Sequence, residues 1–169
     1  MSYLESVQES FKALAFDRFA LGDIISKEST YYHVILTYAL TLTLVLTNYI
    51  VSTYDPILLI GLPLFVSVGI LVLILEQYFM HSLAILFGGD ADFASFFAID
   101  GNVKILLILA AIPEVGFYIA IPTILYLYLY RAYIFENLYG METVGNASAL
   151  AVPILLIFFL LYYGMIGPF

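Results

Sequence analysis

The stretch YYHVILTYALTLTLVLTNYIV, residues 31–51, decides the fold class of this chain. It contains no Asp, Glu, Lys or Arg, and tyrosines stand near both of its ends, where membrane-spanning helices favour aromatic side chains. Crossing the hydrocarbon of a bilayer takes about 20 apolar residues of helix. The stretch therefore predicts a transmembrane helix.

The chain as a whole is strongly apolar. Of its 169 residues, 64% are hydrophobic and 11% are charged, whereas about a quarter of the residues in a typical soluble domain are charged. The apolar runs are continuous, unlike the alternating segments of about 10 residues that form membrane β-barrels. We expect an all-α fold, a polytopic membrane helical bundle.

Further spans follow from the lengths of the apolar runs. The turn STYDP separates the first span from a second at residues 57–75. Residues 94–135 would make a helix about twice as long as the membrane is thick, so we expect two spans divided at IPEVG, residues 112–116. A last span covers residues 147–165. The sequence therefore predicts five transmembrane helices.

The positions of the basic residues give an orientation. All of them fall on one side of the five-span arrangement: Lys12, Arg18, Lys27, Lys104 and Arg131. Because Lys and Arg concentrate in cytoplasmic loops, we expect the N-terminus in the cytoplasm and the C-terminus outside.

An amphipathic helix is expected before the first span. Apolar residues recur there at three- and four-residue spacing, at Leu4, Val7, Phe11 and Leu14. We interpret residues 1–28 as a cytoplasmic amphipathic helix with a linker, and residues 29–169 as the transmembrane domain. This helix would lie on a surface or bind a partner, or pack as a lid on the bundle.

A few polar side chains interrupt the apolar runs and form a candidate intramembrane network. Its members are Glu76, Gln77, His81, Asp100, Lys104 and Arg131. A charge facing lipid is costly, so we expect Glu76 to face inward and to find a partner in Lys104 or Arg131. An ion pair that pins helices together, a pathway for ions or protons, and snorkelling to water all remain open for Glu76. Asp100 and Lys104 stand four residues apart, acid first, and are expected to neutralise each other on one helix face.

The stretch after His81 predicts the end of one helix and the start of another. Gly88 or Gly89 can take the left-handed conformation that ends a helix. Asp90 and Asp92 follow, and acidic residues at a helix N-terminus interact favourably with its dipole.

Several kinds of chemistry have little support in the sequence. The chain has no cysteine and two histidines, and it lacks a phosphate-binding glycine loop, an HExxH motif and a serine elbow. We therefore expect no metal, no cofactor and no enzymatic activity. The net charge of -8 argues against binding nucleic acid.

Three motifs in order resemble the Yip domain family, the Ypt/Rab-interacting membrane proteins. They are HSLAILFGGDADFASFFAI from His81, IPEVG from Ile112, and YGMETVGNASALAVPILL from Tyr139. The positions that match the family motifs are Gly88, Gly89, Phe93, Pro113, Gly116, Tyr139, Gly140, Thr143 and Ala147. The long N-terminal region and the DLYGP-like motif of the eukaryotic members, which are most tied to Rab GTPases, are missing. The resemblance implies five spans and a compact, prokaryotic-type member, without implying a GTPase partner.

Two functions follow as hypotheses. The first is a non-enzymatic membrane scaffold that shapes membranes or recruits a protein partner on its cytoplasmic face, related to membrane trafficking proteins. The second is a small transporter, channel or lipid-handling protein that uses the intramembrane charges. Membrane lipids are partners in both, and a homo-oligomer is compatible with either.

Overall fold

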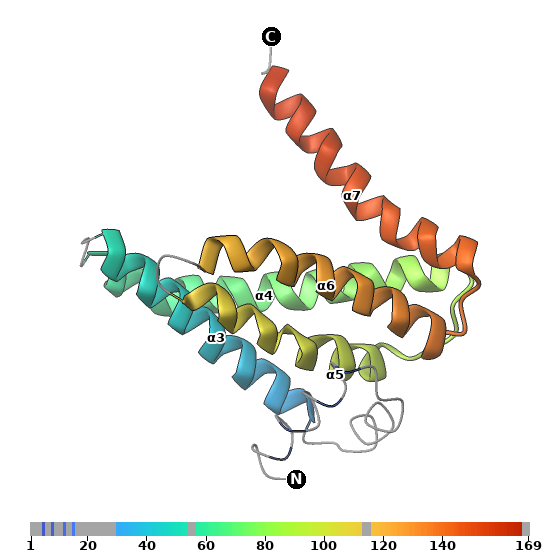
Figure 1. Cartoon of the computed structure of the whole chain (residues 1–169), viewed down its shortest axis with the longest axis horizontal. Coiled ribbons are helices and arrows are strands. Elements are labelled where there is room, and N and C mark those ends of the chain that lie inside the picture. Colours follow the sequence, from blue (N-terminus) through green and yellow to red (C-terminus); the bar gives the residue numbers. More distant parts are fainter. Residues whose placement is uncertain are drawn as a thin grey trace.

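All regular elements in the described part of the chain are helices (Figure 1). The computed structural model describes residues 30–53, 57–112 and 116–166, together with residues 5, 8, 12 and 15. Within these residues there is no strand, which confirms the all-α prediction at this level. The predicted amphipathic helix lies mostly outside the described residues, although Glu5, Gln8 and Lys12 are helical and exposed.

Helices α3 (Thr30–Thr53) and α4 (Ile57–Leu86) are in contact with each other and carry the most membrane-like sequences. Tyr31–Val51 and Leu58–Leu86 are long and apolar enough to cross a membrane. Helix α4 has 30 residues, so it is about 45 Å long. It continues without a break past the predicted span of residues 57–75, so Glu76, Gln77 and His81 belong to the same helix as the apolar run.

The turn after α4 has the geometry that its sequence predicts. Gly88 has a φ of +95°, a left-handed conformation that favours glycine. Asp92 then caps α5 (Phe93–Val103), accepting hydrogen bonds from Ser95 N at 2.8 Å and from Ser95 Oγ at 2.7 Å. These hydrogen bonds lower the pKa of the Asp92 carboxyl below its ordinary value. The glycine pair and the acidic helix start are both confirmed.

Helix α5 is the central element of the bundle, because every residue from Ser95 to Val103 is buried. The chain then changes to a 3₁₀-helix, η1 (Lys104–Ala111), where the sequence had predicted a continuous α-helix. Gly101 and Asn102, both weak helix formers, directly precede the change. A 3₁₀-helix rises about 2.0 Å per residue instead of 1.5 Å, so the change lengthens this element.

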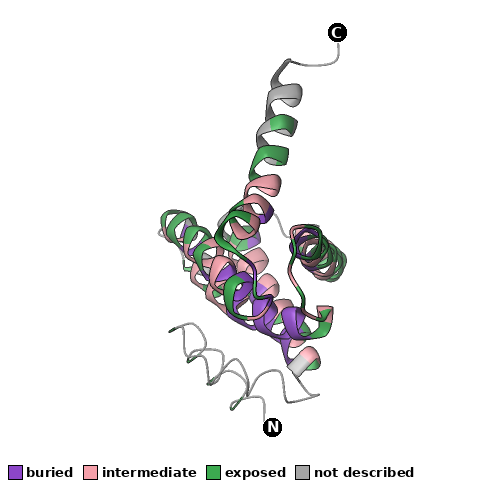
Figure 2. Cartoon of the chain, turned by 90° about the vertical axis from the view of Figure 1, so that its right-hand side faces the viewer, coloured by how far each residue is buried: buried purple, intermediate pink, exposed green. Residues whose placement is uncertain are grey.

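Helix α6 (Gly116–Asn137) contacts α5 and η1, whereas α7 (Thr143–Ile166) takes a different direction. The start of α7 contacts α6 and α4, and the rest projects away from the other helices (Figures 1 and 2). The structure thus forms a bundle from α3 to α6, and α7 does not run along it.

The hydrophobic core lies at the end of the bundle where α4 and α6 finish. Figure 2 shows the buried residues concentrated inside the bundle. They come mainly from the second half of α4, from α5 and from the second half of α6, and include Met80, Phe96, Ile99, Ile134 and Phe135. In contrast, most side chains in the first half of α4 are exposed or half-buried.

The cap at Asp92 makes a testable, pH-dependent contribution to stability. We expect Asp92→Ala to lower the free energy of unfolding by about 1 kcal/mol at neutral pH, because Ser95 N loses its acceptor. A depressed pKa in the folded state means that the contribution is complete above the ordinary value of 3.8 and is lost as the pH falls through the lower folded value. Thermal unfolding from pH 7 to pH 3 measures this loss.

Asp92→Ser is the matched control for this prediction. Serine is also a good N-cap but carries no carboxyl, so its stability relative to Asp92→Ala should not decline at low pH. A deficit in Asp92→Ala that is the same at pH 3 and pH 7 would show that the charge of Asp92 contributes nothing.

Candidate charged site

Asp100 of α5 and Arg131 of α6 form a bidentate ion pair inside the bundle. Arg131 Nε donates to Asp100 Oδ1 at 2.9 Å, and Arg131 Nη2 donates to Asp100 Oδ2 at 2.7 Å. Two parallel hydrogen bonds between guanidinium and carboxylate give a strong and directional contact. The pair therefore fixes α5 against α6.

Two further charges complete a cluster that we call the charged tetrad: Glu76, Asp100, Lys104 and Arg131. Arg131 Nη1 lies 2.7 Å from Glu76 Oε1, and Lys104 Nζ donates to Glu76 Oε2. Lys104 Nζ also lies 3.3 Å from Asp100 Oδ2. Each acid thus contacts both bases, and the two positive charges balance the two negative charges.

The members of the tetrad differ in their access to the surface. The exposed fraction of the side chain is 3% for Asp100, 7% for Arg131, 11% for Lys104 and 36% for Glu76. Burying a charge is costly unless it is paired and hydrogen-bonded, and here every charge has two partners. Arg131 also lies over the ring of Tyr128, at 6.0 Å from its centroid.

The structure brings together four of the six predicted network residues. Glu76 contacts both of the cations that were considered for it. The predicted contact between Asp100 and Lys104 is present, but Asp100 makes its hydrogen-bonded pair with Arg131, a contact that no sequence spacing indicated. On α6, the rings of Tyr130 and Tyr133 are neighbours, with centroids 5.8 Å apart.

Gln77 lies beside the tetrad without joining it. Its side chain is fully buried, and neither Oε1 nor Nε2 has a hydrogen-bond partner. The helix α5 passes close to this amide at Gly101, where an added Cβ would lie 3.3 Å from Gln77 Nε2.

His81 is separate from the tetrad and belongs to an aromatic cluster. Its Nδ1 lies 2.7 Å from Tyr139 Oη, and its ring packs against Phe93 and Phe96. Burial raises the pKa of the Tyr139 phenol, with further contributions from the negative charges of Asp100 and Asp92, so the phenol stays protonated. His81 therefore connects α4 to the segment between α6 and α7.

The motif residues from the α4–α5 and α6–α7 turns meet at one end of the bundle. Asp90 N donates to Tyr139 O at 3.0 Å, and Gly89 lies so close to the Tyr139 ring that an added Cβ would be 2.8 Å from Cδ1. Gly140 is left-handed, with a φ of +64°. We call the two joined turns, residues 87–92 and 138–142, the two-turn end.

The remaining motif residues are not at this junction or contribute little to it. Gly116 is the buried first residue of α6, and Pro113 lies outside the described residues. Thr143 and Ala147 are exposed on α7. Asn146, which occurs in an Asn-Ala-Ser sequence, instead ties α7 to α6, because its Nδ2 donates to Ala132 O at 2.8 Å.

Among the described residues, there is no group of three or more His, Cys, Asp or Glu side chains arranged to hold a metal ion. A groove of about 260 Å³ between α3 and η1 is lined by leucines, isoleucines and three threonines. Another, of about 320 Å³, lies beside Tyr31, Ile74 and Phe93. These grooves are apolar and do not include a member of the tetrad.

Comparison of the chain with known proteins identifies no relative. No model of a known protein family matches the chain, and neither a curated protein nor a solved structure does. The fold and the site therefore define only the class of protein. Its described part is all-helical, two of its helices could span a membrane, and its charged tetrad has no net charge.

Removing Arg131 should damage the fold more than removing Lys104. Arg131→Gln leaves the Asp100 carboxylate buried without its bidentate partner, a loss of about 3–5 kcal/mol. Lys104→Gln should cost less, because Arg131 still holds Asp100 and because Glu76 is partly open to the surface. Unfolding of the purified protein in detergent measures both.

The double variant Asp100→Asn with Arg131→Gln is the control. Because it removes both charges of the pair, it should be more stable than Arg131→Gln alone. Equal losses for Arg131→Gln and Lys104→Gln would contradict the special role of the bidentate pair.

Proposed function

We propose that this chain is a multi-pass membrane protein of the Yip type that serves as a non-enzymatic scaffold and recruits a partner at the two-turn end. The observation that carries the proposal is the tetrad: its four charges neutralise one another between α4, α5, η1 and α6. Charges used in this way hold helices together, because each of the four is engaged by two partners of opposite sign.

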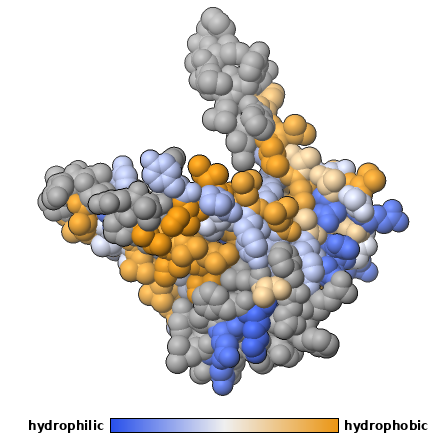
Figure 3. Space-filling view, in the orientation of Figure 1, coloured by the Kyte–Doolittle hydropathy of each residue, from blue (hydrophilic) through white to orange (hydrophobic). Residues whose placement is uncertain are grey.

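The surface of α4 supports a membrane location. Large apolar side chains along this helix are exposed, including Ile60 at 84%, Leu64 at 66% and Leu75 at 58%. Figure 3 shows hydrophobic side chains gathered over the bundle, and hydrophilic ones at the two-turn end and at the lower edge of this face. An apolar surface of this extent is unfavourable in water and is suited to lipid.

The lengths of the helices are compatible with five spans. Helix α6 has 22 residues and α7 has 24, which is about 33 Å and 36 Å. Helix α5 and η1 together are of similar length, because the 3₁₀ segment is extended. In the proposal all five cross the bilayer, with the turns that join α4 to α5 and α6 to α7 on the cytoplasmic side.

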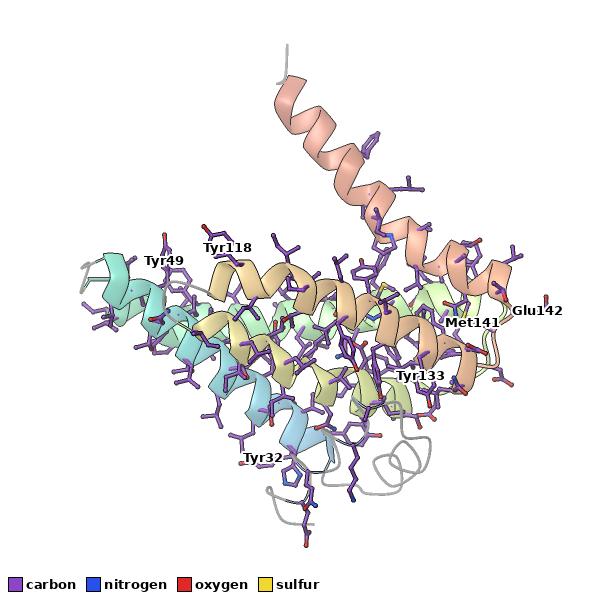
Figure 4. The ribbon with its side chains drawn as sticks, in the orientation of Figure 1. Tyr32, Tyr49, Tyr118, Tyr133, Met141 and Glu142 are labelled. Atoms are coloured by element: carbon purple, nitrogen blue, oxygen red, sulfur yellow. The ribbon has the colours of Figure 1, made fainter. Side chains whose placement is uncertain are left out.

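The two-turn end offers a contact surface of its own. Among the described residues, the exposed charged side chains of this end and of the adjoining helix ends are all acidic. They are Asp90, Asp92, Glu136 and Glu142. In Figure 4 Met141 and Glu142 mark this end, and Tyr49 and Tyr118 mark the opposite one. We place partner recruitment here and on the N-terminal segment.

A transport or lipid-handling role is the second candidate. Glu76 is the member of the tetrad with the greatest access to the surface, and the unpartnered amide of Gln77 follows it in the chain. A polar position of this kind inside a membrane bundle is typical of pathways for ions or small molecules.

Crosslinking in the native membrane tests the scaffold role. The full chain should capture specific proteins, and a chain that lacks residues 1–27 should lose them, as read by mass spectrometry. Glu142→Lys is the matched variant at the two-turn end, where reversal of an exposed acidic charge should weaken the same contacts. Capture that is unchanged in both variants would contradict partner recruitment, and a co-purifying lipid or small molecule without a protein would favour the second candidate.

A further inference from the structure

The Gln77 amide is the most unusual polar group in the described core. It has no exposed surface, and both of its polar atoms lack a partner. A buried amide without hydrogen bonds is costly, and buried polar groups in native proteins are almost always satisfied.

The surroundings of the amide limit what could satisfy it. On the α5 side it faces Gly101, the residue after Asp100, where an added Cβ would lie 3.3 Å from Gln77 Nε2. Val34 of α3 closes the same place, since an added Cβ at Gly101 would lie 2.3 Å from Val34 Cγ1. The amide therefore lies where three helices meet, and its partner must be small.

The chemistry of an amide then defines the partner. A cation would satisfy Oε1 but would be repelled by the Nε2 hydrogens, and an anion would have the opposite mismatch. The neighbouring tetrad contains two acids and two bases and adds no net preference for either charge. A hydroxyl both donates and accepts, so one hydroxyl can satisfy both kinds of atom.

We infer that the Gln77 amide binds a neutral hydroxyl group inside the bundle, between α4 and α5 and beside the charged tetrad. Water supplies the smallest such group, and a lipid with a hydroxyl-bearing headgroup is the other source. This inference does not depend on the proposed scaffold role. The hydroxyl would lie between the helix that carries Glu76 and the helix that carries Asp100.

The sequence allows an unusually clean experiment. Gln8 and Gln77 are the chain's two glutamines, so labelling with ¹⁵N-glutamine gives two side-chain amide signals by NMR. Gln8 is exposed and serves as the internal reference for an amide in contact with solvent. The signal that disappears in Gln77→Met belongs to Gln77. If this variant does not fold, the signal that remains in Gln8→Met identifies the Gln77 amide instead.

We expect the full chain in phosphatidylcholine nanodiscs to show magnetisation transfer from bound water to the Gln77 amide protons, with exchange far slower than at Gln8. If the hydroxyl comes from lipid, water transfer will be absent in phosphatidylcholine, which has no hydroxyl, and the Gln77 signal will shift in phosphatidylglycerol. The absence of water transfer in both lipids, together with an unshifted Gln77 signal, overturns the inference.

Discussion

A carboxylate enclosed by helices stays charged only if cations are held against it, and Asp100 shows how this chain meets that requirement. Arg131 supplies two hydrogen bonds from α6, and Lys104 approaches from one turn further along the same chain segment. Glu76, which lies on α4, balances the second positive charge. Since these residues come from separate helices, the neutrality of the group fixes the helices relative to one another, and the buried α5 lies at the centre.

The two-turn end depends on a different kind of contact. There, aromatic rings and backbone hydrogen bonds join segments that are distant in the sequence, with Tyr139 contacting His81, Gly89 and Asp90. Glycine is needed where the rings come close and where φ is positive, as at Gly88. The charged tetrad and this aromatic junction together give one half of the bundle a packed interior, while the first half of α4 presents apolar side chains outward.

Much of the fold could be predicted from local patterns in the sequence. The helical class follows from uncharged apolar runs, and the turn before α5 follows from two glycines and an Asp92 cap. Contacts between helices could not be predicted in this way, because spacing along one helix does not show which face meets which neighbour. Asp100 thus appeared to need only Lys104, and nothing indicated that His81 would turn to Tyr139 or that η1 would be a 3₁₀-helix. The five spans and the likeness to the Yip family remain predictions.

Membrane placement is the central claim, and cysteine labelling tests it most directly, since the chain has no native cysteine. Single cysteines at Leu64, Leu71 and Leu75 replace side chains that are exposed on α4, and cysteines at Asp90 and Glu142 mark the two-turn end. In opened native membranes, a membrane-impermeant maleimide should react with the two at the turns and leave the three on α4 unmodified until detergent is added. Reaction on α4 as fast as at the turns would show that water covers this surface and would contradict the account.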